Sequence, residues 1–130
     1  MTMLLSESGS RIAIYKGDSL DLRLEVQQEL PDGSRAVYPL TGATLWFTVK
    51  SAIKSAEILI QKVSTDALQI DIDNPDAGQA LIHLTPLDTA NLACKTYYFD
   101  VRVVTASGQR YTIIPPSLFV VEDAVTVLSL

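Results

Sequence analysis

The chain has 130 residues, 48% of them hydrophobic, and a formal net charge of −5 at pH 7. This length is typical of one domain with a sizeable core, and the apolar content argues against a disordered chain. The acidic balance and the lack of a lysine or arginine cluster argue against nucleic acid as a partner, because nucleic-acid-binding proteins neutralise phosphates with basic patches.

The N-terminal segment MTMLLSESGSR has neither the basic start nor the long apolar stretch of a secretory signal peptide. The single cysteine, Cys94, cannot form an internal disulfide, which fits synthesis in the cytoplasm. No apolar run reaches the ~20 residues that a membrane-spanning helix needs. We expect residues 1–9 to form a flexible arm, and we expect no membrane span.

Alternation of apolar and polar residues is the dominant pattern after the arm. It is typical of half-buried strands, whose successive side chains point to opposite faces of a sheet. Turn-rich segments separate the runs, and Ser107-Gly108 lies between two of them as in a hairpin. In chain order, the runs cover residues 11–16, 20–26, 44–50, 57–63, 68–72, 80–84, 97–104, 110–114 and 117–122.

One segment departs from this pattern. In TPLDTANLA, residues 85–93, Thr85 is suited to cap a short helix, with Pro86 at its first position and Asp88 at its third. Eight or nine short strands with one helical turn predict an all-β fold, a β-sandwich over residues 10–126, with a small closed barrel as the competing architecture. Residues 127–130 are expected to form a C-terminal tail.

The sequence offers little catalytic chemistry. His83 is the only histidine, on the non-core side of its strand and without an obvious partner, and Cys94 is interpreted as a buried structural thiol. Asp71 and Asp73 share one face of a strand, but the turn residues that follow favour a solvated segment over a calcium or acid–base site. We therefore expect no catalytic, metal-binding or cofactor-binding residues, and no enzyme.

Three segments carry a resemblance to a known family. They are YKGDSL at residues 15–20, PLTGATLWF at residues 39–47, and AGQALIHLTP at residues 77–86 followed by TYYFDVRV at residues 96–103. Together they resemble the immunoglobulin-like β-sandwich domain of bacteriophage tail and baseplate proteins, and are similar to the N-terminal domain of the baseplate upper protein family. The resemblance implies an antiparallel immunoglobulin-like sandwich and a non-enzymatic virion component that docks on other tail proteins. It also implies synthesis in the cytoplasm of a bacterial host, followed by assembly into the phage tail.

The only tryptophan lies on an unexpected side of its strand. In residues 44–50 the alternation turns Leu45 and Phe47 inward and Trp46 outward. The same reasoning predicts that five apolar residues share the outer face of one sheet, which is our candidate interface: Trp46, Tyr98, Val104, Leu118 and Val120. Such a patch is typical of a protein interface, with other tail proteins or a second copy as the partner.

Three alternatives remain open at this point. The arm or the tail could cover this face, or the strand phase could be wrong. Aromatic side chains on a sheet also stack on sugar rings, which makes a carbohydrate- or host-surface-binding module the alternative function. The outward set is mostly aliphatic apart from Asp100 and Arg102, which favours a protein partner over a glycan.

Overall fold

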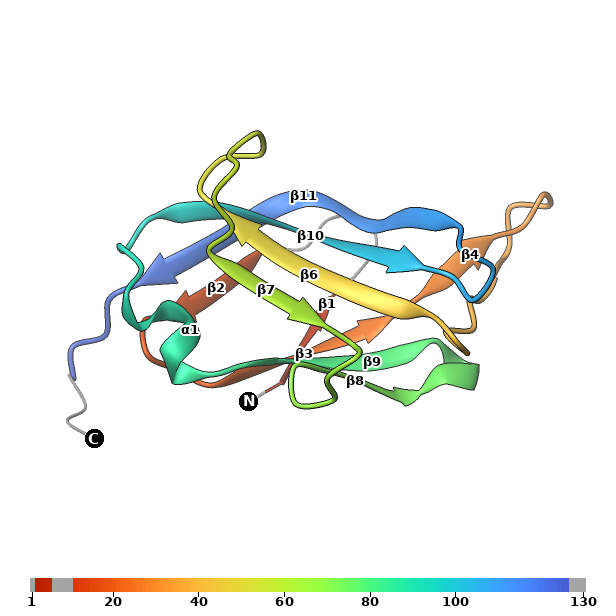
Figure 1. The fold of residues 1–130 in the computed structure, drawn as a ribbon, viewed down its shortest axis with the longest axis horizontal. Helices are drawn as coiled ribbons and strands as arrows, with labels where there is room; N and C mark the ends of the chain where they lie inside the picture. The colour runs from red at the N-terminus through yellow and green to blue at the C-terminus, as the bar shows by residue number, and fades with distance from the viewer. Residues whose placement is uncertain (1, 6–10, 127–130) are drawn as a thin grey trace.

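The computed structural model describes residues 2–5 and 11–126, and in it two sheets pack face to face (Figure 1). The four-stranded sheet has the order β1 (Thr2–Leu5), β3 (Leu20–Glu25), β9 (Gln79–Leu84) and β8 (Ile70–Asn74). The five-stranded sheet has the order β2 (Ile12–Tyr15), β11 (Arg110–Glu122), β10 (Thr96–Val104), β6 (Thr44–Lys50) and β7 (Ile60–Val63). A third, two-stranded sheet consists of β4 (Gln27–Glu29) and β5 (Arg35–Val37). The described helices are one turn of 3-10 helix, η1 (Pro75–Ala77), and the short α1 (Pro86–Ala90).

The predicted β-sandwich is confirmed, and the closed barrel is excluded because the strands form separate sheets. Most neighbouring strands pair antiparallel, whereas β1 pairs with β3 and β2 pairs with β11 in parallel. The predicted neighbours β6, β10 and β11 lie side by side in the five-stranded sheet.

The core lies between the two larger sheets and consists of the inward residue of each alternating pair. In β3 and β10 the burial alternates along the strand as the sequence predicts. At the centre, Phe47 contacts Phe99 and Phe119, with ring centroids 5.6 Å and 6.4 Å away. The Phe47–Phe119 contact is close to edge-to-face, at an interplanar angle of 62°, and a contact of this kind contributes about 0.5–1.5 kcal/mol beyond the burial of its area.

Three details differ from the sequence prediction. Leu68 is 84% exposed, because it lies in the turn before β8, and the inward alternation begins only at Ile70. The runs at 110–114 and 117–122 form one strand, β11, with a register irregularity where Pro115 and Pro116 interrupt the pairing. The β4–β5 hairpin was not predicted as strands at all.

The expected N-terminal arm includes a strand at residues 2–5, because β1 pairs with β3 at the edge of the four-stranded sheet. Met3 packs against the core. The rest of that arm, residues 1 and 6–9, and the predicted tail at 127–130 lie outside the described residues. Residues 2–5 therefore do not cover the face that carries Trp46, which belongs to the other sheet.

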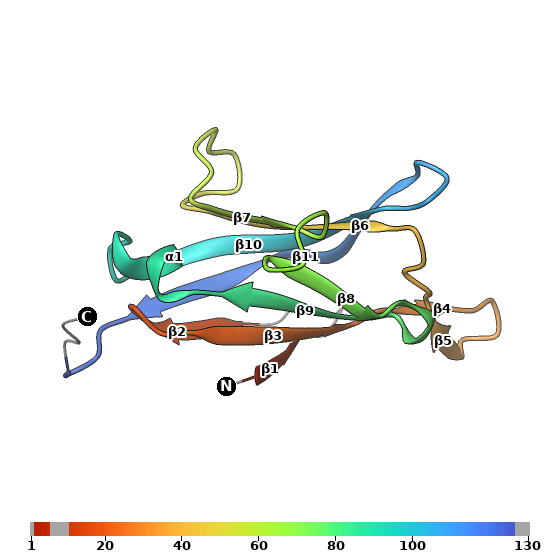
Figure 2. The same ribbon diagram turned by 60° about the horizontal axis from the view of Figure 1, so that its bottom comes forward.

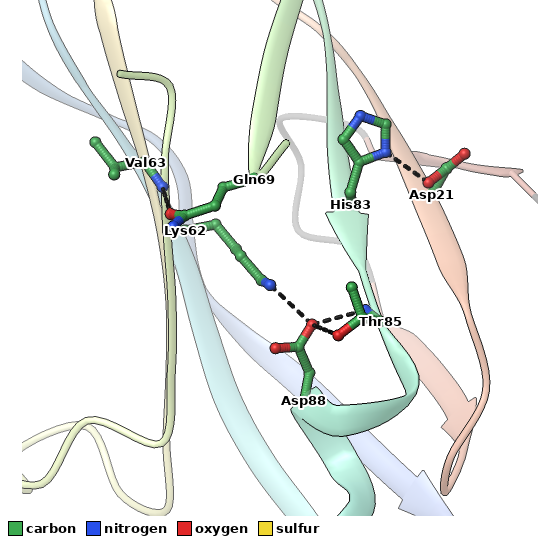
Figure 3. A network of polar contacts seen from close by, with 7 residues as sticks. All are labelled: Asp21, Lys62, Val63, Gln69, His83, Thr85 and Asp88. Carbon is green, nitrogen blue, oxygen red and sulfur yellow. Dashed lines mark hydrogen bonds and ion pairs between the residues drawn. The ribbon is translucent and has the colours of Figure 1, made fainter. Parts of the chain in front are cut away.

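The predicted short helix is present and ties the two sheets together. Thr85 precedes α1, and its backbone N–H donates to Asp88 Oδ2 at 2.7 Å. The same oxygen lies 2.8 Å from Lys62 Nζ on β7, so this ion pair connects the edge of the five-stranded sheet to α1 (Figure 3).

Candidate binding surface

The five predicted interface residues all lie on the outer face of the five-stranded sheet. Their chain neighbours, such as Leu45, Phe47 and Phe119, are buried in the core, so the strand phase is as the sequence predicts. Trp46 is 37% exposed and Leu118 41% exposed. The remaining three, Tyr98, Val104 and Val120, are half-buried.

The register of the strands separates these residues into two groups. Tyr98 lies opposite Leu118 on β11 and opposite Lys50 on β6, whereas Trp46 lies opposite Arg102. Lys50 and Trp46 are four residues apart on β6, so the two aromatic positions are separated by about 13 Å along the strand direction. The sequence placed all five residues on one face but could not show that polar residues separate the two aromatics.

Between the two aromatics the surface is hollowed. One depression, of about 230 Å³, lies toward Tyr98, and a second, of about 390 Å³, lies beside Trp46. Both depressions are lined by Thr48, Gln61 and Arg102, so the two depressions are continuous and together form what we call the trough. The lining of the trough includes Trp46, Thr48, Lys50, Ile53, Ile58, Gln61, Tyr98, Asp100, Arg102, Arg110 and Pro116.

Two loops border the trough at its ends. The loop between β6 and β7 contributes the exposed Ile53 and Ile58 at one end, and Arg110, just after the β10–β11 turn, lies at the other. Both connections project away from the four-stranded sheet (Figure 2). The trough is therefore open to a narrow ligand, whereas a broad flat surface would meet the loops first.

The trough is more basic than the chain as a whole. Lys50, Arg102 and Arg110 line it together with one carboxylate, Asp100. Burial raises the pKa of Asp100 above its ordinary value, while Arg102 and Lys50 act in the opposite direction. Within the described part of the chain none of these four groups lies within ion-pair distance of an opposite charge, and Asp100 interacts with Arg102 and Lys50 at longer range.

Sequence reasoning missed the part of this surface that β7 and the β6–β7 loop contribute. It identified the outward side chains of β6, β10 and β11 but not those that β7 and the β6–β7 loop add, such as Gln61, Ile53 and Ile58. The pairing of Thr48 with Gln61 across β6 and β7 is a register property that no local pattern encodes. A Gln61 Nε2 contact to Thr48 Oγ1 at 3.4 Å joins the two side chains on the trough floor.

The other residues that the sequence singled out do not form a site with one another. His83 has a partner after all, since its Nδ1 lies 2.8 Å from Asp21 Oδ1 (Figure 3). The prediction of a buried Cys94 is wrong: the thiol is exposed, because its segment lies at the surface before β10. It donates to Asp123 Oδ1 at 3.0 Å, and this contact raises its pKa. A raised pKa disfavours the reactive thiolate.

Of the two acidic residues Asp71 and Asp73 that the sequence singled out, Asp73 is paired with Arg23. Asp73 accepts two hydrogen bonds from Arg23, at 2.8 Å and 2.9 Å, and this guanidinium lowers the pKa of Asp73. Asp71 lies opposite Leu81 on β9. Residues 2–5 and 11–126 contain no cluster of three or more histidine, cysteine or acidic side chains that could hold a metal ion.

Comparisons with known proteins bear on the fold. No family model and no curated protein matches the sequence. Among solved structures, the chain is similar to the N-terminal domain of phage TP901-1 ORF48, at a TM-score of 0.50 and 12% identity over 94% of this chain and 97% of that one. No helix in the described part is long and apolar enough to cross a membrane. The chain thus shares its fold with a phage protein domain, and the resemblance expected from the three sequence segments is confirmed at the level of the fold.

Proposed function

We propose that the chain is a non-enzymatic structural module of a phage or prophage tail or baseplate, which acts through protein–protein contacts. The observation that carries this proposal is the fold shared with a phage protein domain over almost the whole chain. On this proposal the protein is made in the cytoplasm of the bacterial host and becomes part of the virion.

The docking surface of this module is the outer face of the five-stranded sheet, with Trp46, Tyr98, Val104, Leu118 and Val120 as its apolar contacts. Trp46 supports this assignment because a large aromatic side chain at 37% exposure is a favoured anchor of protein contacts. Trp46 also lies outside the core, so it can be replaced without loss of the fold.

The test is assembly with the proteins encoded beside this chain, purified after co-expression. A buried aromatic anchor contributes about 2 kcal/mol or more, so Trp46→Arg should raise the dissociation constant of the complex at least about thirtyfold. Leu68→Arg is the matched control, because Leu68 is an exposed apolar residue outside the trough. Equal binding by wild type and Trp46→Arg, with both proteins folded in a thermal melt, would contradict the proposal.

A second candidate function is carbohydrate binding, and the trough itself favours it. Between Trp46 and Tyr98 the floor presents the hydroxyl, amide and carboxylate groups of Thr48, Gln61 and Asp100. Together these groups donate and accept hydrogen bonds, as sugar hydroxyls require. Saturable quenching of Trp46 fluorescence by neutral or acidic oligosaccharides, lost in Tyr98→Ala, would establish this function; no quenching up to millimolar sugar would exclude it.

A further inference from the structure

The β4–β5 hairpin stands apart from both larger sheets. It forms its own two-stranded sheet and extends beyond the end of the sandwich (Figures 1 and 2). All described side chains of β4 are exposed, and in β5 only Ala36 is half-buried. The base of the hairpin is joined to the rest of the sandwich, because the Tyr38 N–H donates to the Val26 carbonyl and the Val26 N–H donates to the Gly78 carbonyl. The exposed end that another surface can cover is therefore its tip.

The tip of the hairpin is nevertheless well ordered by its own hydrogen bonds. The Leu30 N–H donates to the Ser34 carbonyl at 2.8 Å, and the Gly33 N–H donates to the Leu30 carbonyl at 2.9 Å. Asp32 accepts from both the backbone and the hydroxyl of Ser34, which lowers its pKa and keeps it charged at neutral pH. A preformed tip loses little conformational entropy when it binds.

The hairpin exposes apolar and acidic groups close together. Leu30, next to the turn, is 37% exposed, and Val37, at the base of the hairpin opposite Gln27, is 43% exposed. Glu29 and Asp32 lie beside Leu30 in the sequence, and Arg35 is the only basic residue from 27 to 37. The hairpin therefore offers an apolar tip with flanking carboxylates.

The trough offers the complementary set. Ile53, Ile58 and Tyr98 supply apolar contacts, whereas Lys50 and Arg102 supply positive charge. The β6–β7 connection and the β10–β11 turn both project on the side away from the four-stranded sheet (Figure 2). A hairpin is a narrow element that can lie between two such projections. Charge complementarity of this kind fixes the register of an interface and speeds association.

We propose that the trough of one copy receives the β4–β5 hairpin of a second copy. The inference rests on the proposed function, because it names a partner for the same docking surface. The contact joins two different surfaces, so it is head-to-tail, and repeated contacts of this kind produce closed rings or open chains.

Two double variants test the contact on the full chain. The hairpin variant, Glu29→Thr with Leu30→Ser, keeps an intact trough, and the trough variant, Arg102→Thr with Arg110→Thr, keeps an intact hairpin. All four side chains lie outside the core, and threonine suits the strand positions. Leu68→Ser is the control, because it removes an exposed apolar side chain elsewhere.

Sedimentation velocity over a range of concentrations gives the readout. Wild type and Leu68→Ser should form assemblies larger than dimers, and high salt should weaken this association. Each double variant should raise the dissociation constant of self-association at least about tenfold. An equimolar mixture of the two variants should form a dimer and stop there, because it contains one usable hairpin and one usable trough. Circular dichroism of each variant checks that the sandwich is intact.

Three results would overturn the inference: a wild-type monomer at all concentrations, a hairpin variant that associates like wild type, or a mixture that stays monomeric. A monomeric wild type whose Trp46→Arg variant loses docking to another tail protein would leave the proposed function standing. The opposite combination would contradict the proposed function and leave the inference standing: association of the chain that depends on the hairpin, together with a Trp46→Arg variant that docks on other tail proteins as well as wild type does.

Discussion

The pKa of Asp100 reflects the position of this residue in the trough. Its side chain lies opposite Thr48, in the row between the two aromatics, and burial raises its pKa. The sequence predicts that Asp100 and Arg102 both point outward. Burial outweighs the opposing effect of Arg102 and Lys50 on this pKa, and the sequence alone does not reveal how far Asp100 is buried.

Asp100→Asn is predicted to raise the free energy of unfolding at pH 7. Because the pKa of Asp100 is higher in the folded than in the unfolded chain, where it is near 3.8, the folded protein binds more protons between the two values. The wild type therefore loses stability relative to the variant as pH rises above about 3.8, and the difference levels off above the folded pKa. Urea unfolding of both proteins from pH 3 to 7 measures this.

Asp73→Asn serves as the matched comparison and should have the opposite sign. Arg23 lowers the pKa of Asp73 in the folded state, so its contribution is present above the unfolded value and disappears as pH falls through the folded pKa. The pair is partly exposed, so the loss at pH 7 should be below about 1 kcal/mol. Two variants that shift stability in the same direction would show that burial does not dominate at Asp100.

At the scale of single elements, period-two alternation predicted the strands that have one buried face. In β3, β6, β9 and β10 every second residue is buried, and the sequence identified all four. It missed β4 and β5, because three-residue strands with both faces exposed carry no alternation. In the β4–β5 hairpin only the turn, Pro31 to Ser34, has a recognisable sequence signal, because proline, aspartate and glycine favour turns.

Gly78, which ends η1, should tolerate no side chain. Its φ is +67°, and a Cβ there would lie 2.6 Å from the Tyr38 carbonyl oxygen and 2.7 Å from that of Val26. Gly78→Ala is therefore predicted to cost about 2–4 kcal/mol, from left-handed strain of about 1–2 kcal/mol plus displacement of the backbone that leads into the β4–β5 hairpin.

Gly108 provides the control for this prediction in the β10–β11 turn. Its φ is +87°, but a Cβ there would meet nothing within 4 Å, so Gly108→Ala should cost only the strain. Chemical denaturation of both variants gives the two values. Equal losses would mean that the backbone near Gly78 moves aside freely.

For the whole molecule, the sequence predicted a sandwich and three neighbouring strands of its five-stranded sheet, β6, β10 and β11, because the alternation and the family resemblance agreed. The sequence could not predict the trough, because its lining combines residues of the β6–β7 loop, the edge strand β7 and the start of β11 with those of β6 and β10. Nor could it predict how the sheets are joined at their edges, since Lys62 and Asp88 are 26 positions apart in elements without a shared pattern. Long-range polar contacts of this kind are a property of the assembled fold.

The Lys62–Asp88 pair is predicted to be strongly coupled. Only 10% of the Lys62 side chain and 17% of the Asp88 side chain are exposed, so removal of one partner leaves a charge with little water around it. Asp88→Ala should lower the free energy of unfolding by about 3 kcal/mol or more. It leaves Lys62 without its partner, and it also removes the carboxylate that accepts a hydrogen bond from the N–H of Thr85, the residue before α1. Lys62→Met should also be destabilising, because it leaves the Asp88 carboxylate without its charged partner, but it should cost less than Asp88→Ala, since Asp88 is the more exposed of the two and keeps its contact with Thr85. In the Lys62→Met background, Asp88→Ala should then cost only the loss of its hydrogen bond from the Thr85 N–H, about 1 kcal/mol.

A double-mutant cycle by urea denaturation measures the coupling between the two residues, which should be about 2 kcal/mol. Additive losses would show that the ion pair does not help to hold the two sheets together at this edge.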